Sequence, residues 1–192
     1  AGYRRMVLEL GGNDPIIVME DADLDEASTL AVQGSYKNSG QRCTAIKRML
    51  VHEAVAARFV EQVAEKTRAW KYGDPMDKSN DMGTVIDEPA ALLFESRVNE
   101  AVAQGAKLLV GNQRQGALYA PTVLDNVDPR MTVALEETFG PVSPIIRFKD
   151  IDDAIRISNG TAYGLSSSVC TNRLDYITRF VNELHVGSVN VR

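Results

Sequence analysis

Short apolar runs alternate with longer amphipathic segments along almost the whole of this 192-residue chain. Strand-like runs cover residues 5–10, 16–19, 47–51, 107–110, 121–124, 144–148, 165–170 and 188–191. Helical patterns cover residues 23–37, 52–70, 89–104, 151–158 and 173–184. Asp23 can cap the first of these helices, and Glu26 completes a pattern similar to a capping box. The alternation predicts one α/β domain with a largely parallel sheet and helices on both faces.

The composition argues against several classes of function. The net charge is −5 and the acidic residues are spread along the chain, so we expect no nucleic-acid partner. The longest apolar runs are far shorter than a bilayer span, and the first residues lack a signal peptide's apolar stretch and cleavage site. Two cysteines far apart give no disulfide framework. We therefore expect no membrane association and a cytoplasmic location with reduced thiols.

Cys43 is the first candidate for chemistry. It follows Gly40-Gln41-Arg42, a turn that lets the backbone approach a substrate and lets the Cys43 N–H face a developing oxyanion. The neighbouring Arg42 would favour the thiolate, which is the nucleophilic form. A buried structural cysteine is the competing interpretation, and local composition alone favours it. Cys170 lies in a strand-like run with no charge beside it, so we interpret it as structural.

Glu9 is the second candidate, because it ends an apolar run beside Leu10 and two glycines. A carboxylate there would be partly removed from water, so we expect its pKa to rise toward the range of a general base. An ordinary carboxylate at a strand end is the competing interpretation.

The third candidate is the segment 136–141, which reads Glu-Glu-Thr-Phe-Gly-Pro. Gly-Pro favours a turn, so the side chains before it are presented in a defined way. A carboxylate suits a ribose diol, and an aromatic ring suits packing against a nicotinamide. A surface acidic pair beside a core phenylalanine is the alternative interpretation.

In order and spacing, these three segments resemble the aldehyde dehydrogenase superfamily, with Glu9 34 residues before Cys43. The segment 159–165 also resembles that family, so the resemblance covers essentially the whole chain. It implies that residues 1–192 form a doubly wound α/β catalytic domain. The family's nucleotide-binding domain and C-terminal oligomerisation segment have no counterpart in this sequence, which also lacks a G-x-G-x-x-G phosphate loop.

The resemblance implies an NAD(P)-dependent oxidation of a small-molecule aldehyde. The Cys43 thiolate would attack the aldehyde, and Glu9 would activate the water that hydrolyses the resulting thioester. The oxyanion would be held by the Cys43 N–H and by an asparagine from the absent half. Family members are usually dimeric or tetrameric, so a homodimer or homotetramer is expected for the longer parent. We expect the isolated chain not to oxidise aldehydes.

The resemblance also assigns a cofactor side to the site. Glu137 would hold the nicotinamide ribose and Phe139 would flank the ring, with Leu10 and Gly11 beside them. NAD or NADP would bind mainly to the absent domain, so the sequence does not distinguish the two cofactors.

Two positions depart from the common family pattern. Asn13 follows Gly-Gly, where a lysine is usual. Many members also carry a ribose-binding lysine just after the stretch that corresponds to residues 83–88, and residues 89–93 contain no lysine. We therefore expect the ribose contact to depend more heavily on Glu137.

The run 38–48 resembles family members that act on anionic aldehydes, namely phosphonoacetaldehyde dehydrogenase and non-phosphorylating glyceraldehyde-3-phosphate dehydrogenase. The Arg42 guanidinium could bind a phosphonate or phosphate in a forked geometry and place the aldehyde over sulfur. Thr44 would lie on the same substrate side. In the alternative, Arg42 only favours the thiolate form of Cys43 or pairs with a carboxylate.

Other classes of function remain open at this stage. A general or lactaldehyde-type aldehyde dehydrogenase would carry the same motifs, and so would a non-catalytic binding or assembly module that has kept them. His52 and His185 have no Asp, Cys or second His at ligand spacing, so we expect no metal site.

Overall fold

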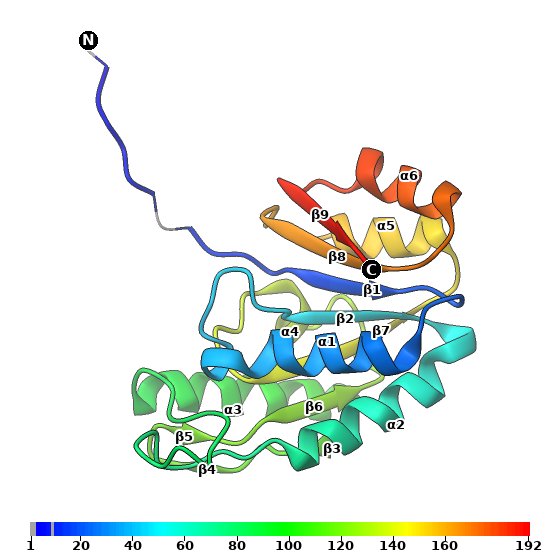
Figure 1. Cartoon of the computed structure of the whole chain (residues 1–192). Coiled ribbons are helices and arrows are strands. Elements are labelled where there is room, and N and C mark those ends of the chain that lie inside the picture. The colour runs from blue at the N-terminus through cyan, green and yellow to red at the C-terminus, as the bar shows by residue number, and fades with distance from the viewer. Residues whose placement is uncertain (1–2, 9) are drawn as a thin grey trace.

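A computed structural model describes residues 3–8 and 10–192. Within them, seven strands form one sheet in the order β3-β6-β7-β2-β1-β8-β9 (Figure 1). The strands are β1 (Pro15–Val18), β2 (Arg48–His52), β3 (Lys107–Val110), β6 (Thr122–Asp125), β7 (Val142–Phe148), β8 (Ser166–Cys170) and β9 (Ser188–Val191). All neighbouring pairs are parallel except β3 with β6, which is antiparallel. The predicted α/β class with a largely parallel sheet is therefore confirmed.

Helices cover both faces of the sheet. They are α1 (Leu24–Tyr36), α2 (Glu53–Ala69), α3 (Glu88–Ala103), α4 (Thr132–Leu135), α5 (Ile151–Asn159) and α6 (Leu174–Glu183). The central strand β1 shows why, because all four of its residues are buried and successive side chains point to opposite faces. Ile16 belongs to the core cluster under α1 and α2, and Ile17 belongs to the cluster under α3 to α6.

Aspartates begin several of these helices as N-caps. Asp23 accepts hydrogen bonds from the N–H groups of Asp25 and Glu26 at 3.0 and 3.1 Å, as predicted for the start of α1. Asp87 and Asp150 cap α3 and α5 in the same way. Of the helices in the described residues, none combines the length and apolar composition that crossing a bilayer requires.

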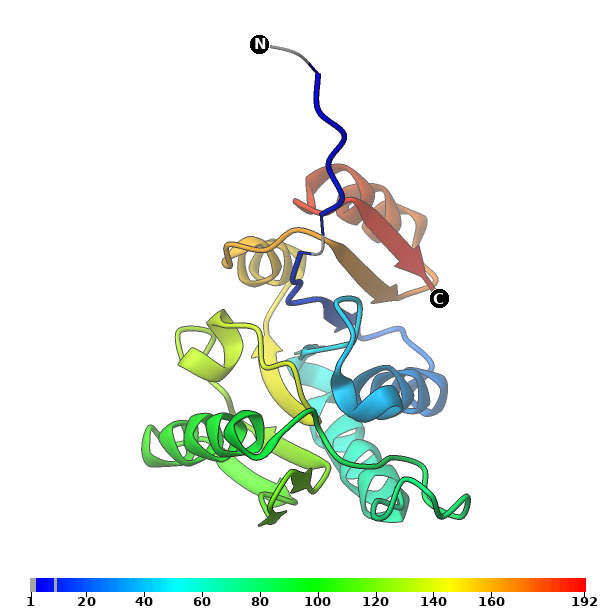
Figure 2. The same ribbon diagram turned by 90° about the vertical axis from the view of Figure 1, so that its left-hand side faces the viewer.

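The strand predicted over residues 5–10 is wrong for the part that the structure describes. Residues 3–8 and 10 form no regular element, and residues 3–8 extend away from the body (Figures 1 and 2). Met6, Val7 and Leu8 are exposed. A strand needs a hydrogen-bonding neighbour, and no described segment of this chain pairs with this run, whatever its apolar character.

Sequence patterns also missed several short elements. These are the 3₁₀ turn η1 (Lys37–Gly40), the helix α4 and the two-stranded ribbon of β4 (Arg114–Gln115) and β5 (Leu118–Tyr119). A four-residue helix spans barely one turn and a two-residue strand shows a single alternation, so neither displays a recognisable period.

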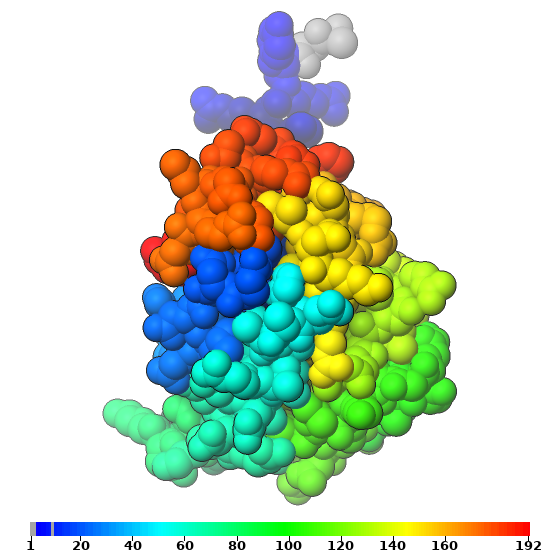
Figure 3. All heavy atoms as spheres, turned by 90° about the vertical axis from the view of Figure 1, so that its right-hand side faces the viewer, coloured from blue at the N-terminus to red at the C-terminus, as the bar shows by residue number. Residues whose placement is uncertain are grey.

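The three motif segments meet at one edge of the sheet. Residues 10–14, 41–47 and 136–141 lead directly into β1, β2 and β7, which are adjacent and parallel. Their amino ends therefore lie side by side, at the edge that faces the viewer in Figure 2. The opposite edge, seen in Figure 3, is covered by chain that leads into α1, α2, α5 and α6 (blue, cyan, yellow and orange). Ligands of open α/β sheets commonly bind at the carboxyl edge, so this arrangement is unusual.

Candidate active site

A hollow of about 590 Å³ opens at the amino edge of the sheet. It is lined by Leu10, Gly11, Gln41, Arg42, Cys43, Thr44, Glu137 and Phe139. These include every residue predicted for the site except Glu9, which lies outside the described residues. The structure thus brings together side chains from all three motifs, which are separated by up to 129 positions in the sequence (139 − 10).

Cys43 lies in a tight turn over residues 42–45, called the nucleophile turn below. The turn is closed by a hydrogen bond of 3.1 Å from the Ala45 N–H to the Arg42 carbonyl. Cys43 is a free, exposed cysteine. Among the described residues its N–H meets no hydrogen-bond acceptor, so this donor is available to a bound oxyanion.

The approach to this turn is conformationally costly. Asn38, Ser39 and Gly40 all adopt positive φ angles, of 56°, 55° and 73°. Such a conformation is unfavourable for serine, and clusters of this kind concentrate at functional sites. Gly40 is required for a second reason, because a Cβ there would lie 2.3 Å from the Gly140 carbonyl oxygen. The second and third motifs therefore meet backbone to backbone.

The Gly-Gly pair of the first motif lies between the other two motifs. A Cβ on Gly11 would lie 2.2 Å from Glu137 Oε2, and one on Gly12 would lie 2.6 Å from the Cys43 carbonyl oxygen. The Gly12 N–H donates to Glu137 Oε1 at 3.1 Å. The two glycines therefore allow the thiol segment and the carboxylate segment to approach each other.

Glu137 is held from several directions. Besides Gly12, the Lys47 ammonium lies 3.4 Å from Glu137 Oε1. Arg97 of α3 donates to the Glu137 carbonyl at 2.6 Å, and the Glu137 N–H donates to the Tyr163 hydroxyl at 3.3 Å. Its neighbour Glu136 is exposed. The second glutamate of the motif is thus the one that the fold directs into the hollow.

Lys47 is a site residue that the sequence analysis missed. It is only 3% exposed, and its Nζ donates to the carbonyls of Arg42 and Cys43 at 2.8 Å each. Burial lowers its pKa, and the negative charges of Glu137, Asp14 and Cys43 oppose that shift. A lysine that begins an otherwise buried strand was the available signal, because lysine is rarely buried without partners.

Asn13 and Asp14 fix the loop that precedes β1. The Asn13 amide donates to the Ala134 carbonyl at 2.9 Å, so the residue that replaces the usual lysine ties this loop to α4. Asp14 accepts from the N–H and the hydroxyl of Ser166, while burial raises its pKa. Arg48, whose pKa burial lowers to about 10, donates to the Asn13 carbonyl at 2.8 Å.

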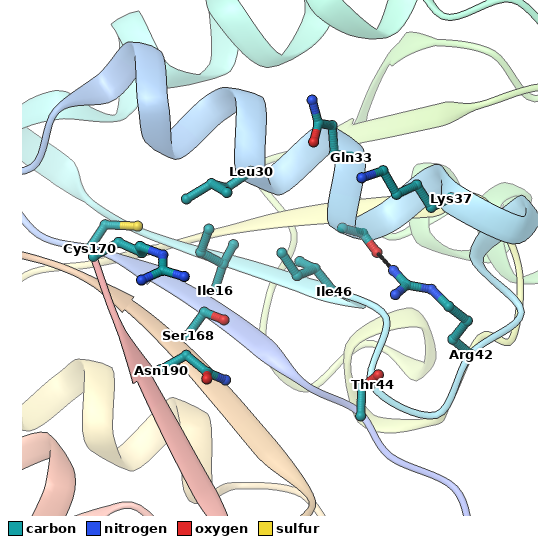
Figure 4. Close-up of a pocket in the computed structure, with 12 residues that line it drawn as sticks. Ile16, Leu30, Gln33, Lys37, Arg42, Thr44, Ile46, Ser168, Cys170 and Asn190 are labelled. Atoms are coloured by element: carbon teal, nitrogen blue, oxygen red, sulfur yellow. Dashed lines mark hydrogen bonds between the residues drawn. The ribbon is translucent and has the colours of Figure 1, made fainter. Parts of the chain in front are cut away.

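Arg42 separates the first hollow from a second one. Its guanidinium donates to the Gly34 carbonyl at 2.8 Å (Figure 4), and its Nε is buried without a hydrogen-bond partner. The second hollow, of about 300 Å³, is lined by Ile16, Leu30, Gln33, Gly34, Lys37, Arg42, Thr44, Ile46, Ser168, Cys170, Asn190 and Arg192. Three of these residues are cationic and none is a carboxylate. Among the described residues no carboxylate pairs with Arg42, and Glu9 lies outside them, so the carboxylate partner stays an open alternative.

Cys170 is buried, whereas Cys43 is exposed. It is 4% exposed on β8, and burial raises the pKa of its thiol to about 12. Within the described part of the chain, no group of three or more His, Cys, Asp or Glu side chains is placed to hold a metal ion.

A comparison with protein families decides the classification of this arrangement. Residues 1–192 match the model of the aldehyde dehydrogenase family. The chain belongs to the aldehyde dehydrogenase family. The superfamily resemblance inferred from the three motifs is therefore confirmed.

Relatives agree with the family match. The chain is 41% identical, over 98% of its length, to a sulfoacetaldehyde dehydrogenase of Neptuniibacter caesariensis. It is 43% identical, over its full length, to an NADP-dependent glyceraldehyde-3-phosphate dehydrogenase of Streptococcus equinus. These matches cover 41% and 40% of the two relatives, so the chain spans about two fifths of their length.

A solved structure agrees with the fold. The glyceraldehyde-3-phosphate dehydrogenase GapN of Methanocaldococcus jannaschii, complexed with NADP, superposes with a TM-score of 0.94 at 38% identity. The match covers 99% of this chain and 41% of that one.

Proposed function

We propose that this chain is the catalytic domain of an NAD(P)-dependent aldehyde dehydrogenase. The observation that carries the proposal is the hollow in which Gly11, Cys43 and Glu137 converge from three separate motifs. We assign residues 1–192 to that domain and expect the nucleotide-binding domain elsewhere in a longer protein.

In the proposed reaction, the Cys43 thiolate forms a bond to the aldehyde carbon, and the Cys43 N–H stabilises the resulting oxyanion. When bound, NAD⁺ or NADP⁺ accepts the hydride that leaves this carbon, so that a thioester forms on Cys43. Water, deprotonated by Glu9, then adds to the thioester carbon. The carbon–sulfur bond breaks, which releases the carboxylic acid and restores the thiol. The role of Glu9 rests on the family resemblance.

The residues of the hollow fit a nicotinamide riboside. The Glu137 carboxylate is partly exposed and held by donors, so its remaining lone pairs can accept from a ribose diol. Phe139 is 41% exposed, so its ring can pack against a flat heterocycle. Leu10 and Gly11 line the same part of the hollow. A larger residue at position 11 would displace the Glu137 carboxylate.

We further propose that the substrate is an aldehyde with a phosphonate, phosphate or sulfonate group. The Arg42 guanidinium has no carboxylate partner among the described residues, and among them only its Nη2 has a hydrogen-bond acceptor, the Gly34 carbonyl. Lys37 and Arg192 line the same side, and Thr44 lies between the two hollows. Two relatives named above are dehydrogenases of sulfoacetaldehyde and glyceraldehyde 3-phosphate, which are both anionic.

The test compares aldehydes on the full-length protein. Rates with phosphonoacetaldehyde, sulfoacetaldehyde, glyceraldehyde 3-phosphate and neutral lactaldehyde are measured for wild type, Arg42→Ala and Arg156→Ala, an exposed arginine of α5. Loss of one charge-assisted contact should raise KM for the anionic aldehydes about tenfold in Arg42→Ala only. An equal loss with lactaldehyde would show that Arg42 only supports the thiol and would favour a lactaldehyde-type enzyme.

Catalysis itself is tested by thiol reactivity. Iodoacetamide at neutral pH should alkylate Cys43 much faster than Cys170, because only Cys43 is exposed. Equal inertness of the two thiols would favour the non-catalytic module. The 192-residue chain alone should produce no NAD(P)H from any of these aldehydes, and measurable production would contradict the domain assignment.

A further inference from the structure

Lys47 is a buried cation whose ammonium, among the described residues, donates hydrogen bonds to the nucleophile turn. Its Nζ donates to the carbonyls of Arg42 and Cys43 at 2.8 Å, with a longer contact of 3.5 Å to the Ala45 carbonyl. The same atom lies 3.4 Å from Glu137 Oε1 and 5.8 Å from the centre of the Phe139 ring. One ammonium therefore touches both the thiol side and the cofactor side of the hollow.

The adjacent residue shows that this placement is specific. Arg48 is equally buried, at 3% exposure, but its bonds go to the carbonyls of Asn13, Ile157 and Ser158. Those partners join a loop to the end of α5, so Arg48 holds elements of the fold together. Burying a lysine is costly unless its partners compensate, and the partners that the described residues supply to the Lys47 ammonium belong to the site.

The contact with Arg42 has a geometric consequence for the proposed oxyanion donor. The Arg42 carbonyl and the Cys43 N–H belong to one peptide group, which is planar and trans. Within such a group the C=O and N–H bonds point in opposite directions. By binding the Arg42 carbonyl, Lys47 therefore turns the Cys43 N–H away from the protein interior.

We propose that Lys47 is a positioning residue that aims the Cys43 N–H and, at the same time, anchors the Glu137 carboxylate. The proposal rests on the function proposed above. It adds a link between the oxyanion donor of Cys43 and the cofactor contact of Glu137. Lys47 itself touches neither the reacting thiol nor the substrate; it acts through the nucleophile turn and through Glu137.

The experiment uses the full-length protein in four forms: wild type, Lys47→Met, Glu137→Gln and the double variant. Phe180→Leu changes a buried core residue of α6 that does not line the hollow, and it controls for lost stability. Two quantities are measured: the rate of Cys43 alkylation, followed on its peptide, and KM for NAD(P)⁺ beside kcat. Cys170 labelling in the same samples reports whether each variant is folded, because this thiol is buried.

We expect Lys47→Met to slow Cys43 alkylation several-fold, because the turn loses both its anchor and a nearby positive charge, and Glu137→Gln to leave it unchanged. Loss of the charged contact should raise the cofactor KM of Lys47→Met about tenfold. The double variant should have the cofactor KM of Glu137→Gln alone, because both changes act through one carboxylate.

Behaviour of Lys47→Met that matches Phe180→Leu in both measurements would overturn the proposal. Additive effects on the cofactor KM would overturn the link through Glu137. If Cys170 labelling shows that Lys47→Met is unfolded, Lys47→Gln replaces it, with the same expected changes. The alkylation rate needs neither cofactor nor substrate, so it tests the turn even if the wild-type protein oxidises no aldehyde.

Discussion

At Gly12, a single added methyl group would press against the nucleophile turn. A Cβ there would lie 2.6 Å from the Cys43 carbonyl oxygen and 3.0 Å from Asp14 Oδ1. The Cys43 carbonyl is also an acceptor for Lys47, so the nucleophile turn cannot move away without losing that bond. Small size at this position is therefore a requirement of packing between two segments.

We predict that Gly12→Ala destabilises the protein by about 2 kcal/mol, in the range of other overpacked sites, and slows Cys43 alkylation. Gly116→Ala is the matched control. Gly116 has a φ of 58° but nothing within 4 Å of an added Cβ, so this change should cost about 1 kcal/mol from backbone strain alone. Urea unfolding and alkylation rates measure both effects. Unchanged Cys43 reactivity in Gly12→Ala would contradict the packing argument.

Arg42 and Lys47 are both cations of the segment that leads into β2, but their hydrogen-bond partners differ. Carbonyls and a carboxylate surround the Lys47 ammonium. Among the described residues, Arg42 donates to a single acceptor, the Gly34 carbonyl. Lys47, with its hydrogen bonds made inside the protein, is suited to hold the surrounding segments in place. Arg42, with fewer partners, is suited to bind a ligand.

At the scale of elements, α1 leads the chain into the candidate active site. Its last residue, Tyr36, is followed by η1 and then by the nucleophile turn. Asp23 begins α1 by accepting from two backbone N–H groups, which would otherwise lack partners. The start of this helix is therefore determined locally, while its end is set by the left-handed residues that lead to Cys43.

We predict that Asp23→Ala lowers the free energy of unfolding by about 1 kcal/mol, the usual cost of a lost N-cap. Asp23→Asn keeps an acceptor oxygen and should stay within a few tenths of a kcal/mol of wild type. Urea unfolding of the two variants at neutral pH provides the comparison. Equal destabilisation by Ala and Asn would mean that the charge of Asp23, rather than its hydrogen bonds, stabilises α1.

At the scale of the whole molecule, buried tyrosine hydroxyls make the folded state less stable as the pH rises into the alkaline range. Tyr36 is fully buried, donates to the Thr122 carbonyl at 3.3 Å, and has its pKa raised by burial to about 12. Tyr119 and Cys170 are shifted in the same direction. Because the folded state holds these protons more tightly than the unfolded state, their contribution is complete below the unfolded pKa and is lost as pH rises.

We predict that Tyr36 alone removes about 2–3 kcal/mol of stability between pH 10 and pH 12. Tyr36→Phe should therefore show a shallower loss of stability with pH than wild type, even though it begins less stable because the Thr122 carbonyl loses a donor. Tyr3→Phe changes an exposed phenol and should keep the wild-type slope. Urea midpoints at pH 9, 10 and 11 give the slopes, and identical slopes for Tyr36→Phe and wild type would refute the assignment.

Local patterns were enough to predict the α/β class, all seven sheet strands and the five longer helices, because periodicity and caps depend on neighbours in sequence. They were not enough for residues 5–10, where an apolar run has no strand to pair with in the described chain. The three motifs also pointed to residues that the fold brings together, since Cys43, Glu137 and Phe139 line a common hollow, while their roles stay predictions.

Other features depend on contacts between distant segments, which no local pattern encodes. The bond from Gly12 to Glu137 joins residues 125 positions apart, and the position of the site at the amino edge follows from the order of the strands. In the sequence, Lys47 is a polar residue at the start of a strand. In the structure, two carbonyls and a carboxylate surround its ammonium. Its burial is favourable only in that assembled environment, because the cost of removing its charge from water is offset by partners from separate segments.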